Sequence, residues 1–415
     1  PLTNVQIAPG FNKQVTATGA EGQWTDGDFV RFRYSLPEKI GGWQQITGET
    51  LVGAAREQLV WADLDGRRYA AIGTNKALII YYEGAFYDIT PLESAVTGFT
   101  FDTTNTSATV TVNKASHGLS VGDLFTFTSV TPPVGAGYVA DDFETNTFQV
   151  VTVPDTGTFT ITMATAATAT TSASGAATVN PYIKPGPLTQ TYGYGWGTDT
   201  WSSGEWGEAS STSNVILDPA SWSLDHFGQK LIATIKNGKT FEWDPIASDN
   251  NALTTRATLV SGAPTRSVMS IVSERDRHLI ILGTETTIGN ESTQDKMFIR
   301  FSDQEDISDY TPTSINTAGT FRLDSGVKII GAVKAKDYIL ILTDTSAYVM
   351  QFVGPPFTFS IRQVGSNCGA IGQHAMKYVN GRVYWMGQAG GFFVFDGTVK
   401  SLPCLVEDFV FTNKG

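Results

Sequence analysis

The histidines and carboxylates of this chain are the side chains that could hold a metal ion, but their spacing along the sequence matches no known metal-binding motif. The four histidines lie far apart, and none has a second histidine or cysteine at the spacing of a metal site: His117, His226, His278 and His374. The acidic run 303–309 offers oxygen ligands for Ca²⁺, but it lacks the turn glycine and the terminal glutamate of a calcium loop. We therefore predict a solvated loop at 303–309, and no metal or cofactor.

Motifs for covalent or phosphoryl chemistry are missing as well. The sequence contains no Gly-x-x-x-x-Gly-Lys phosphate loop and no Gly-x-Ser-x-Gly nucleophile elbow. The stretch 199–204 has only a superficial likeness to the Asp-containing turns of sialidase propellers. Among 40 acidic residues a catalytic pair can always meet in a fold, and sequence alone does not reveal one. Nothing here requires catalysis, so we expect a protein that is not an enzyme and has no catalytic residues.

Two groups of residues are candidates for an interface. Aromatic side chains concentrate in a glycine-rich stretch and comprise Tyr192, Tyr194, Trp196, Trp201 and Trp206. Such rings can stack on sugar rings or supply contact area to a protein, and packing between repeats or subunits is the favoured interpretation.

Arg31 and Arg33 form the second group, on one face of a strand predicted over 28–34, with Phe29 beside them and Val30, Phe32 and Tyr34 opposite. Pro37 and the glycines at 41–42 are expected to stop this strand. The two arginines either pair with acidic neighbours of the same or another subunit, or form an exposed edge.

The elements that position these residues are predicted to be strands. Charged residues make up 16% of the chain against the roughly 25% usual for soluble domains, and 42 glycines separate short apolar or alternating runs. An apolar strand, a tight turn and an aromatic-bearing strand recur five times, at 69–88, 229–245, 278–303, 338–352 and 382–396. Meanders of this kind must stack on one another to bury their faces. The sequence thus predicts an all-β fold, with β-propeller-like repeats of short antiparallel meanders.

One segment interrupts the repeats. From about Val96 the composition shifts to Thr, Ala and Val, which predicts a small β domain inserted in a propeller loop. The expected organisation is N-terminal strands and the first blade over 1–95, an inserted sandwich-like β domain over 96–182, and the remaining blades over 183–415. No strand near the end of the sequence obviously closes a ring, so either the natural chain is longer or the N-terminal strand completes the last blade.

Charge and hydropathy limit the partners. A net charge of −12 argues against a groove that grips nucleic acid, because such binding depends on Lys and Arg. No run of 18 apolar residues and no signal-peptide pattern is present, so we expect a protein soluble as made, without a membrane partner. Cys368 and Cys404 are too few for a disulfide framework and are expected to be reduced core residues.

Three N-terminal stretches carry a resemblance to a known family: residues 7–11 (IAPGF), 24–33 (WTDGDFVRFR) and 37–43 (PEKIGGW). They resemble the start of tail proteins of short-tailed bacteriophages. Residues 331–342 (GAVKAKDYILIL) resemble a blade of the tail nozzle or hub family of those phages, and 117–123 (HGLSVGD) resembles small β domains inserted in phage structural proteins.

The resemblance implies a hexameric, propeller-bearing tube in the virion tail, assembled in the host cytoplasm, through which the genome leaves the particle. It implies as partners further copies of the chain, the adaptor at the head-to-tail junction, and tail fibres or spikes. DNA in the lumen would make only transient, non-specific contact. It carries over no catalytic residues. The alternative is a glycan-binding or glycan-cleaving propeller, such as a receptor-binding protein or depolymerase.

Overall fold

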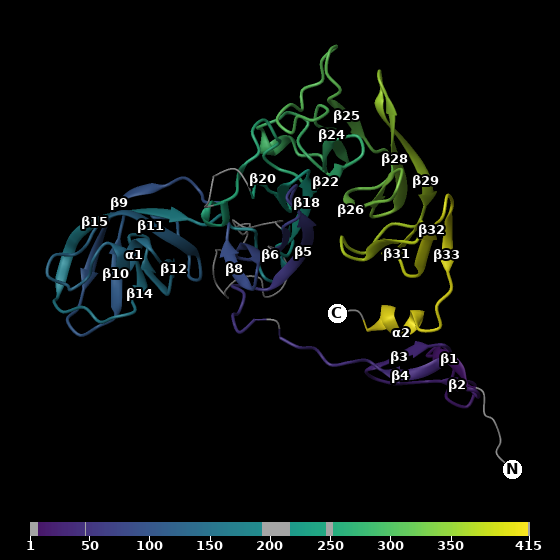
Figure 1. Ribbon diagram of the computed structural model, residues 1–415, viewed down its shortest axis with the longest axis horizontal. Coiled ribbons are helices and arrows are strands. Elements are labelled where there is room, and N and C mark those ends of the chain that lie inside the picture. Colours follow the sequence, from purple (N-terminus) through teal and green to yellow (C-terminus); the bar gives the residue numbers. More distant parts are fainter. Residues whose placement is uncertain (1–6, 46, 193–215, 246–251, 414–415) are drawn as a thin grey trace, which may run out of the picture. The chain divides into compact units, whose positions relative to one another are not determined.

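The computed structural model describes residues 7–45, 47–192, 216–245 and 252–413, and the chain forms two compact units. One unit is made by residues 1–48 together with 261–415, and the other by residues 49–260. The described residues are mostly in strands, with only short helices: α1 (Asp141–Glu144), α2 (Glu407–Thr412), and the 3-10 turns η1 (Ala252–Thr254) and η2 (Glu291–Thr293). The elements are labelled in Figure 1.

Five four-stranded antiparallel sheets form the repeats, and in each the strands are neighbours in chain order. The unit of residues 49–260 contains two of them, formed by β5 (Ala55–Ala62), β6 (Arg68–Thr74), β7 (Leu78–Tyr82) and β8 (Ala85–Asp88), and by β18 (Trp222–Phe227), β19 (Lys230–Ile235), β20 (Thr240–Trp243) and β21 (Thr258–Leu259).

The other unit contains the remaining three four-stranded sheets. The first has β22 (Met269–Ser273), β23 (His278–Leu282), β24 (Phe298–Phe301) and β25 (Gly319–Arg322); the second has β26 (Ile329–Lys334), β27 (Ile339–Thr343), β28 (Ser346–Gly354) and β29 (Thr358–Ser366); the third has β30 (Met376–Val379), β31 (Arg382–Met386), β32 (Phe392–Phe395) and β33 (Val399–Leu402). Each predicted repeat lies within one of the five sheets. The predicted all-β class, with propeller-like repeats of short meanders, is confirmed.

Neighbouring sheets pack through apolar faces, with their first strands close together: β5 with β18, β22 with β26, and β26 with β30. Trp222 shows why the packing is tight. Its indole is fully buried, and its Nε1 donates to the backbone oxygen of Thr74 at 2.7 Å. The ring lies against Gly73, where a Cβ atom would come within 2.5 Å of Trp222 Cδ1. Glycine at 73 therefore permits the contact between two repeats.

The N-terminal residues form a separate pair of two-stranded sheets. β1 (Ala8–Phe11) pairs with β2 (Gln23–Trp24), and β3 (Val30–Arg33) pairs with β4 (Leu36–Lys39). Phe32 joins the two sheets, because its ring lies 5.3 Å from that of Phe11 and 6.4 Å from that of Trp24. The sheet of β30–β33 has four strands of its own, so the expectation that the N-terminal strand completes the last blade is wrong.

The predicted strand over 28–34 is also corrected. Phe29 and Tyr34 lie outside β3 with φ of +55° and +51°, and Ser35 follows at +66°. Two successive residues with positive φ make the tight hairpin turn whose twist matches that of the flanking strands. Pro37 does not stop a strand; it lies within β4, on a two-stranded sheet where a missing N–H is tolerated.

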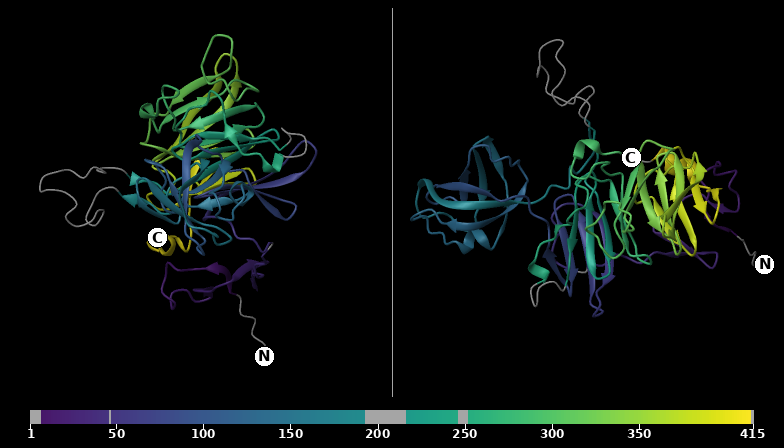
Figure 2. Two further views of the ribbon diagram at one scale, coloured as in Figure 1. Left: turned by 90° about the vertical axis from the view of Figure 1, so that its left-hand side faces the viewer. Right: turned by 90° about the horizontal axis from the view of Figure 1, so that it is seen from above.

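The inserted β domain forms one seven-stranded sheet, in the order β12-β11-β15-β9-β10-β14-β13. Its strands are β9 (Val96–Thr103), β10 (Thr109–Asn113), β11 (Leu124–Thr131), β12 (Thr147–Gln149), β13 (Thr152–Asp155), β14 (Thr158–Thr162) and β15 (Thr171–Pro181). Figure 2 shows that the sheet is strongly curved. Its concave side encloses its own core, in which Phe99, Phe101, Phe125, Phe127 and Phe159 are fully buried.

Two further expectations concern membranes and cysteines. Among the described residues, no helix is long and apolar enough to cross a bilayer. Both cysteines are unpaired. Cys368 is buried, and burial raises the pKa of its thiol, whereas Cys404 is only half-buried. The expectation of two core cysteines is thus correct for Cys368 and wrong for Cys404.

Candidate functional site

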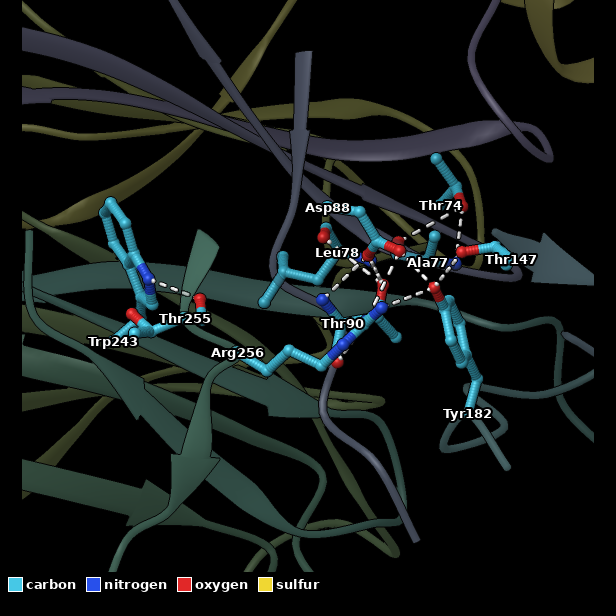
Figure 3. A network of polar contacts seen from close by, with 10 residues as sticks. All are labelled: Thr74, Ala77, Leu78, Asp88, Thr90, Thr147, Tyr182, Trp243, Thr255 and Arg256. Carbon is cyan, nitrogen blue, oxygen red and sulfur yellow. Dashed lines mark hydrogen bonds and ion pairs between the residues drawn. The ribbon is translucent and has the colours of Figure 1, made fainter. Parts of the chain in front are cut away.

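A polar network fastens the inserted domain to the repeats within the unit of residues 49–260 (Figure 3). Its members come from three places in the chain. Asp88 and Thr90 end the first meander, Tyr182 follows the last strand of the insert, and Arg256 precedes β21. The network is therefore positioned to control how the insert is held on the repeats.

The Tyr182 hydroxyl is the centre of the network. It donates to Asp88 Oδ2 and accepts from Arg256 Nη2 at 2.7 Å. The Thr147 hydroxyl, on β12 of the insert, lies 2.9 Å from it. Arg256 also donates to the Thr90 carbonyl at 2.9 Å and covers the Tyr182 ring at 4.5 Å. All three hydrogen-bonding positions of a phenol are thus in use.

The surroundings of Tyr182 fix its protonation state. Burial, and next the negative charge of Asp88, raise the pKa of Tyr182 to about 12. The hydroxyl therefore keeps its proton at neutral pH and donates it to the carboxylate. A neutral phenol between a carboxylate and a guanidinium is suited to holding the inserted domain on the repeats, and its raised pKa disfavours the phenolate that a nucleophile requires.

Two lysines add to the attachment. Lys184 Nζ lies 2.6 Å from Asp123 Oδ2, and Lys76 Nζ donates to the Gly122 carbonyl at 3.3 Å. Both contacts use the loop 117–123 that the sequence singled out. His117 Nδ1 accepts from the Leu119 amide at 3.1 Å, so this histidine shapes the loop.

The predicted interface residues Arg31 and Arg33 lie on the N-terminal hairpin. Arg31 Nε is 2.5 Å from Glu38 Oε1 on the facing strand, and Arg33 Nη1 is 4.0 Å from the same oxygen. Arg33 also lies over the Tyr34 ring at 5.4 Å. Both arginine side chains remain more than half exposed, at 59% and 58%. They pair within the chain and still present an outward surface.

The aromatic candidates stay untested. Tyr194, Trp196, Trp201 and Trp206 lie outside the described residues. For Tyr192 only the backbone is described, in β16 (Thr191–Tyr192), which pairs with β17 (Ile216–Leu217).

The acidic run 303–309 uses its carboxylates locally. Asp303 accepts from the Thr317 hydroxyl and amide and from the Gln304 amide, Asp306 binds Ser308, and Asp309 binds Thr311 and Asn316. Burial alone would raise the pKa of Asp303, but the hydrogen bonds from Thr317 and Gln304 outweigh it and lower this pKa. These carboxylates shape their loop by binding different groups.

A cavity of about 310 Å³ lies in the other unit, between the turns after β22 and β26. Its apolar lining includes Met350, Phe352 and Phe359. Its rim carries two ion pairs between the turns: Lys334 with Glu274, and Arg275 with Asp337 at 3.4 Å. Sequence reasoning missed this cavity because its lining comes from strands and turns distributed over residues 272–359.

His278 lies close to this cavity and is fully buried. Its Nδ1 is 2.8 Å from the Ser302 carbonyl, and its Nε2 is a buried atom without a hydrogen-bond partner. The rings of Phe352 and Phe359, which line the cavity, lie 6.0 and 5.2 Å from the imidazole. Burial lowers the pKa of His278, so it is a neutral donor to Ser302.

Comparison with known proteins gives no family. No family model and no curated protein matches the sequence. Among solved structures, a phage phi92 endosialidase aligns with 85% of this chain and 55% of its own, at 15% identity and a TM-score of 0.27. The AfRom2 CNH domain aligns with 46% of this chain and 58% of its own, at 12% identity and 0.30. A Synechocystis apocarotenoid oxygenase aligns over 76% and 71%, at 11% identity and 0.25.

The chain spans little more than half the length of the first two structures. At these TM-scores we draw no argument about its function from them.

Proposed function

We propose that this chain is a structural subunit of a phage tail, a nozzle or hub that assembles with copies of itself into a conduit for DNA. The observation that carries the proposal is the exposure of four large apolar side chains in the N-terminal hairpin segment (residues 29–43). Phe29 is 79% exposed, Tyr34 87%, Leu36 69% and Trp43 98%. The same segment carries the resemblance to tail proteins.

Exposure on this scale indicates a surface that is covered in the working particle. The three exposed rings, at 79 to 98% exposure, offer roughly 500 Å² together, against the ~800 Å² that each partner buries in a standard interface. Aromatic side chains and arginine are enriched in interfaces, and the same segment carries Arg31 and Arg33, of which Arg33 lies over the Tyr34 ring.

Charge favours further copies of this chain as the cover. The hairpin segment carries three positive side chains and one negative one, a net charge of +2, whereas the whole chain carries −12. A second copy therefore offers a surface of opposite sign to the hairpin. The same shortage of Lys and Arg suits the wall of a conduit, because DNA that must leave should not be gripped.

The inserted domain supplies a second feature of the proposal. Its attachment through Tyr182, Asp88 and Arg256 uses hydrogen bonds and an ion pair, so the domain is held at a defined place on its unit. A module held in this way suits the lateral docking of fibres or spikes. The adaptor and the fibres remain proposed partners.

The test is the mass of the full chain in solution, alone and with its particle's adaptor, by light scattering and electron microscopy. We expect a ring of about six subunits with an axial channel, as the resemblance implies. The double variant Tyr34→Ser and Trp43→Ser should remain folded and monomeric. Val134→Ser is the matched control, because Val134 is 80% exposed but lies in the inserted domain. A wild-type chain that stays monomeric with the adaptor present would contradict the proposal.

The cavity beside Met350 supports a second candidate function, the binding or cleavage of a glycan. It has an apolar lining and carboxylates at its rim, as a saccharide site requires. Glu274 and Asp337, however, are already engaged in ion pairs with Lys334 and Arg275. Cleavage of a polysaccharide by the wild-type chain, and its loss in Glu274→Gln, would support this candidate.

A further inference from the structure

A groove of about 490 Å³ lies on the inserted domain and shares no lining residue with the cavity just described. Its polar lining includes Asp142 and Asn146 at the α1 turn and Thr147 and Gln149 on β12, and its apolar lining includes Phe148 and Met163. The volume falls in the range of ordinary ligand sites, ~300–1,000 Å³. Apolar and polar side chains thus line one opening on the inserted domain.

The hydrogen bonds within the groove leave mainly oxygen acceptors for a ligand. Asn146 Nδ2 donates to the Asp142 carbonyl at 3.0 Å and to Thr145 Oγ1 at 3.3 Å. Gln149 Nε2 donates to the Gly122 carbonyl at 3.1 Å, and the Thr147 hydroxyl is bound to Tyr182.

The acceptor oxygens of these lining residues make fewer hydrogen bonds within the chain than their donor groups do. Asp142 Oδ2 takes the Val139 amide at 2.9 Å, which leaves Oδ1 of the same carboxylate. Asn146 Oδ1 and Gln149 Oε1 are two further acceptor oxygens, from side-chain amides, that a ligand can use. Among the described residues that line the groove, none is lysine, arginine or histidine. Thr162 and Thr165 add two hydroxyls, which can donate or accept. The groove therefore offers oxygen acceptors, these hydroxyls, one negative charge and no positive charge, so it suits the hydroxyl groups of a neutral ligand and disfavours an anion.

We propose that this groove binds a neutral saccharide. Sugar hydroxyls are donors that suit the oxygens of Asp142, Asn146 and Gln149, and the apolar face of a sugar ring suits Phe148 and Met163. Acidic glycans and nucleic acid are disfavoured by Asp142. A divalent cation would find a single carboxylate among the described lining residues, too few for a calcium site.

Thr147 connects the groove to the junction between the inserted domain and the repeats. It belongs both to the groove and to the junction network, where its hydroxyl meets that of Tyr182. The groove wall on β12 is thereby anchored to the repeats, so a bound saccharide meets a preorganised surface. The groove lies within a single copy of the chain, so saccharide binding can be tested independently of assembly into the proposed conduit.

The experiment uses the full chain and immobilised polymers: dextran, mannan and galactan as neutral probes, and alginate as the anionic one. We expect binding to at least one neutral polymer and none to alginate. Asp142→Asn should weaken binding about tenfold or more, because it replaces a charged acceptor while the amide oxygen can still take the Val139 N–H. Asn146→Ala should weaken binding in the same direction.

Asp141→Asn is the matched control, since it removes the neighbouring charge from a residue outside the lining and should leave binding unchanged. Circular dichroism establishes that each variant is folded. Binding to none of the neutral polymers would overturn the proposal, as would preference for alginate. Neutral-polymer binding that survives both Asp142→Asn and Asn146→Ala would place the saccharide elsewhere and overturn it as well.

Discussion

Replacing Tyr182 with Phe tests whether the junction network holds the inserted domain. The substitution removes one oxygen and, with it, the bonds to Asp88, Arg256 and Thr147. Hydrogen bonds to charged groups contribute about 1.5–3 kcal/mol each. Asp88 and Arg256 are 34% and 24% exposed and still contact each other at 3.3 Å, so water and their own pairing recover part of the loss. We expect a net loss of about 2 kcal/mol in the free energy of opening the junction.

Hydrogen exchange is the assay, because the network supports particular amides. The Leu78 amide donates to the Thr90 hydroxyl at 2.9 Å, and the Thr90 amide donates to Asp88 Oδ1 at 2.9 Å. A loss of about 2 kcal/mol should make these amides exchange about thirtyfold faster in Tyr182→Phe. Tyr138→Phe is the control: it loses one bond, from its hydroxyl to the Thr165 carbonyl at 3.0 Å, within the insert.

The same substitution should change the response to alkaline pH. A pKa raised from 10.0 to about 12 means that the folded state favours the neutral phenol, so this stabilisation is complete below about pH 10 and is lost as the pH rises through 12. Two pKa units correspond to about 2.7 kcal/mol. Unchanged exchange at Leu78 and Thr90, together with an alkaline response equal to wild type, would refute the role given to the network.

Three further predictions follow from other described contacts. Because burial lowers the pKa of His278 below 6.5, its stabilisation is complete above about pH 6.5 and is lost as the pH falls, and His278→Phe should flatten the fall in melting temperature between about pH 7 and 5. Gly73→Ala should destabilise the first two repeats by about 1–3 kcal/mol in denaturant titrations followed by tryptophan fluorescence, whereas Gly48→Ala, with open space around it, should not. Phe125→Ala should cost the insert about 3–5 kcal/mol, measured by hydrogen exchange; full protection in the variant would contradict its place in the core.

The repeats could be recognised from the sequence because their central strands bury both faces. The strand β23, for example, is buried at all five positions, and residues 279–282 of it form a continuous apolar run. β8 falls within the predicted meander over 69–88, but the fourth strands of the other four sheets were not recognised. β21 has two residues, both exposed, and β33 is mostly exposed, so their side chains carry almost no hydrophobic signal. Such strands form through backbone pairing with a neighbour, which composition does not encode.

The N-terminal hairpin shows a different cause of error. Turns with two positive φ values are usually signalled by Asn-Gly or Asp-Gly. Here Tyr34 and Ser35 adopt this conformation without either signal, so Tyr34 was placed in the strand and Pro37 was interpreted as its end. The arginines were correctly identified as neighbours on one strand, and their pairing with Glu38 required knowledge of the register.

The junction and the groove were not predictable from local sequence. Tyr182 lies 94 positions from Asp88 and 74 from Arg256, and each is an ordinary residue in its own stretch. The groove likewise combines the α1 turn, β12 and the residues after β14. Of the segments at the junction, only the loop 117–123 was singled out from the sequence, through its resemblance to phage structural proteins. In the structure it contributes to the attachment through Asp123 and Gly122.

The two ends of the inserted domain leave the repeats side by side. Val96 pairs with Val179, Leu92 bridges Tyr182, and the Ile183 amide donates to the Pro91 carbonyl at 3.0 Å. The domain thus occupies a single gap between adjacent backbone positions, as a hairpin loop would. Recombination can shorten, lengthen or exchange the sequence between 93 and 181 without changing the path of the repeats. A lineage of such proteins can therefore change what it displays while the supporting sheets stay the same, because Tyr182, Asp88 and Arg256 lie outside the exchanged stretch and keep their mutual contacts.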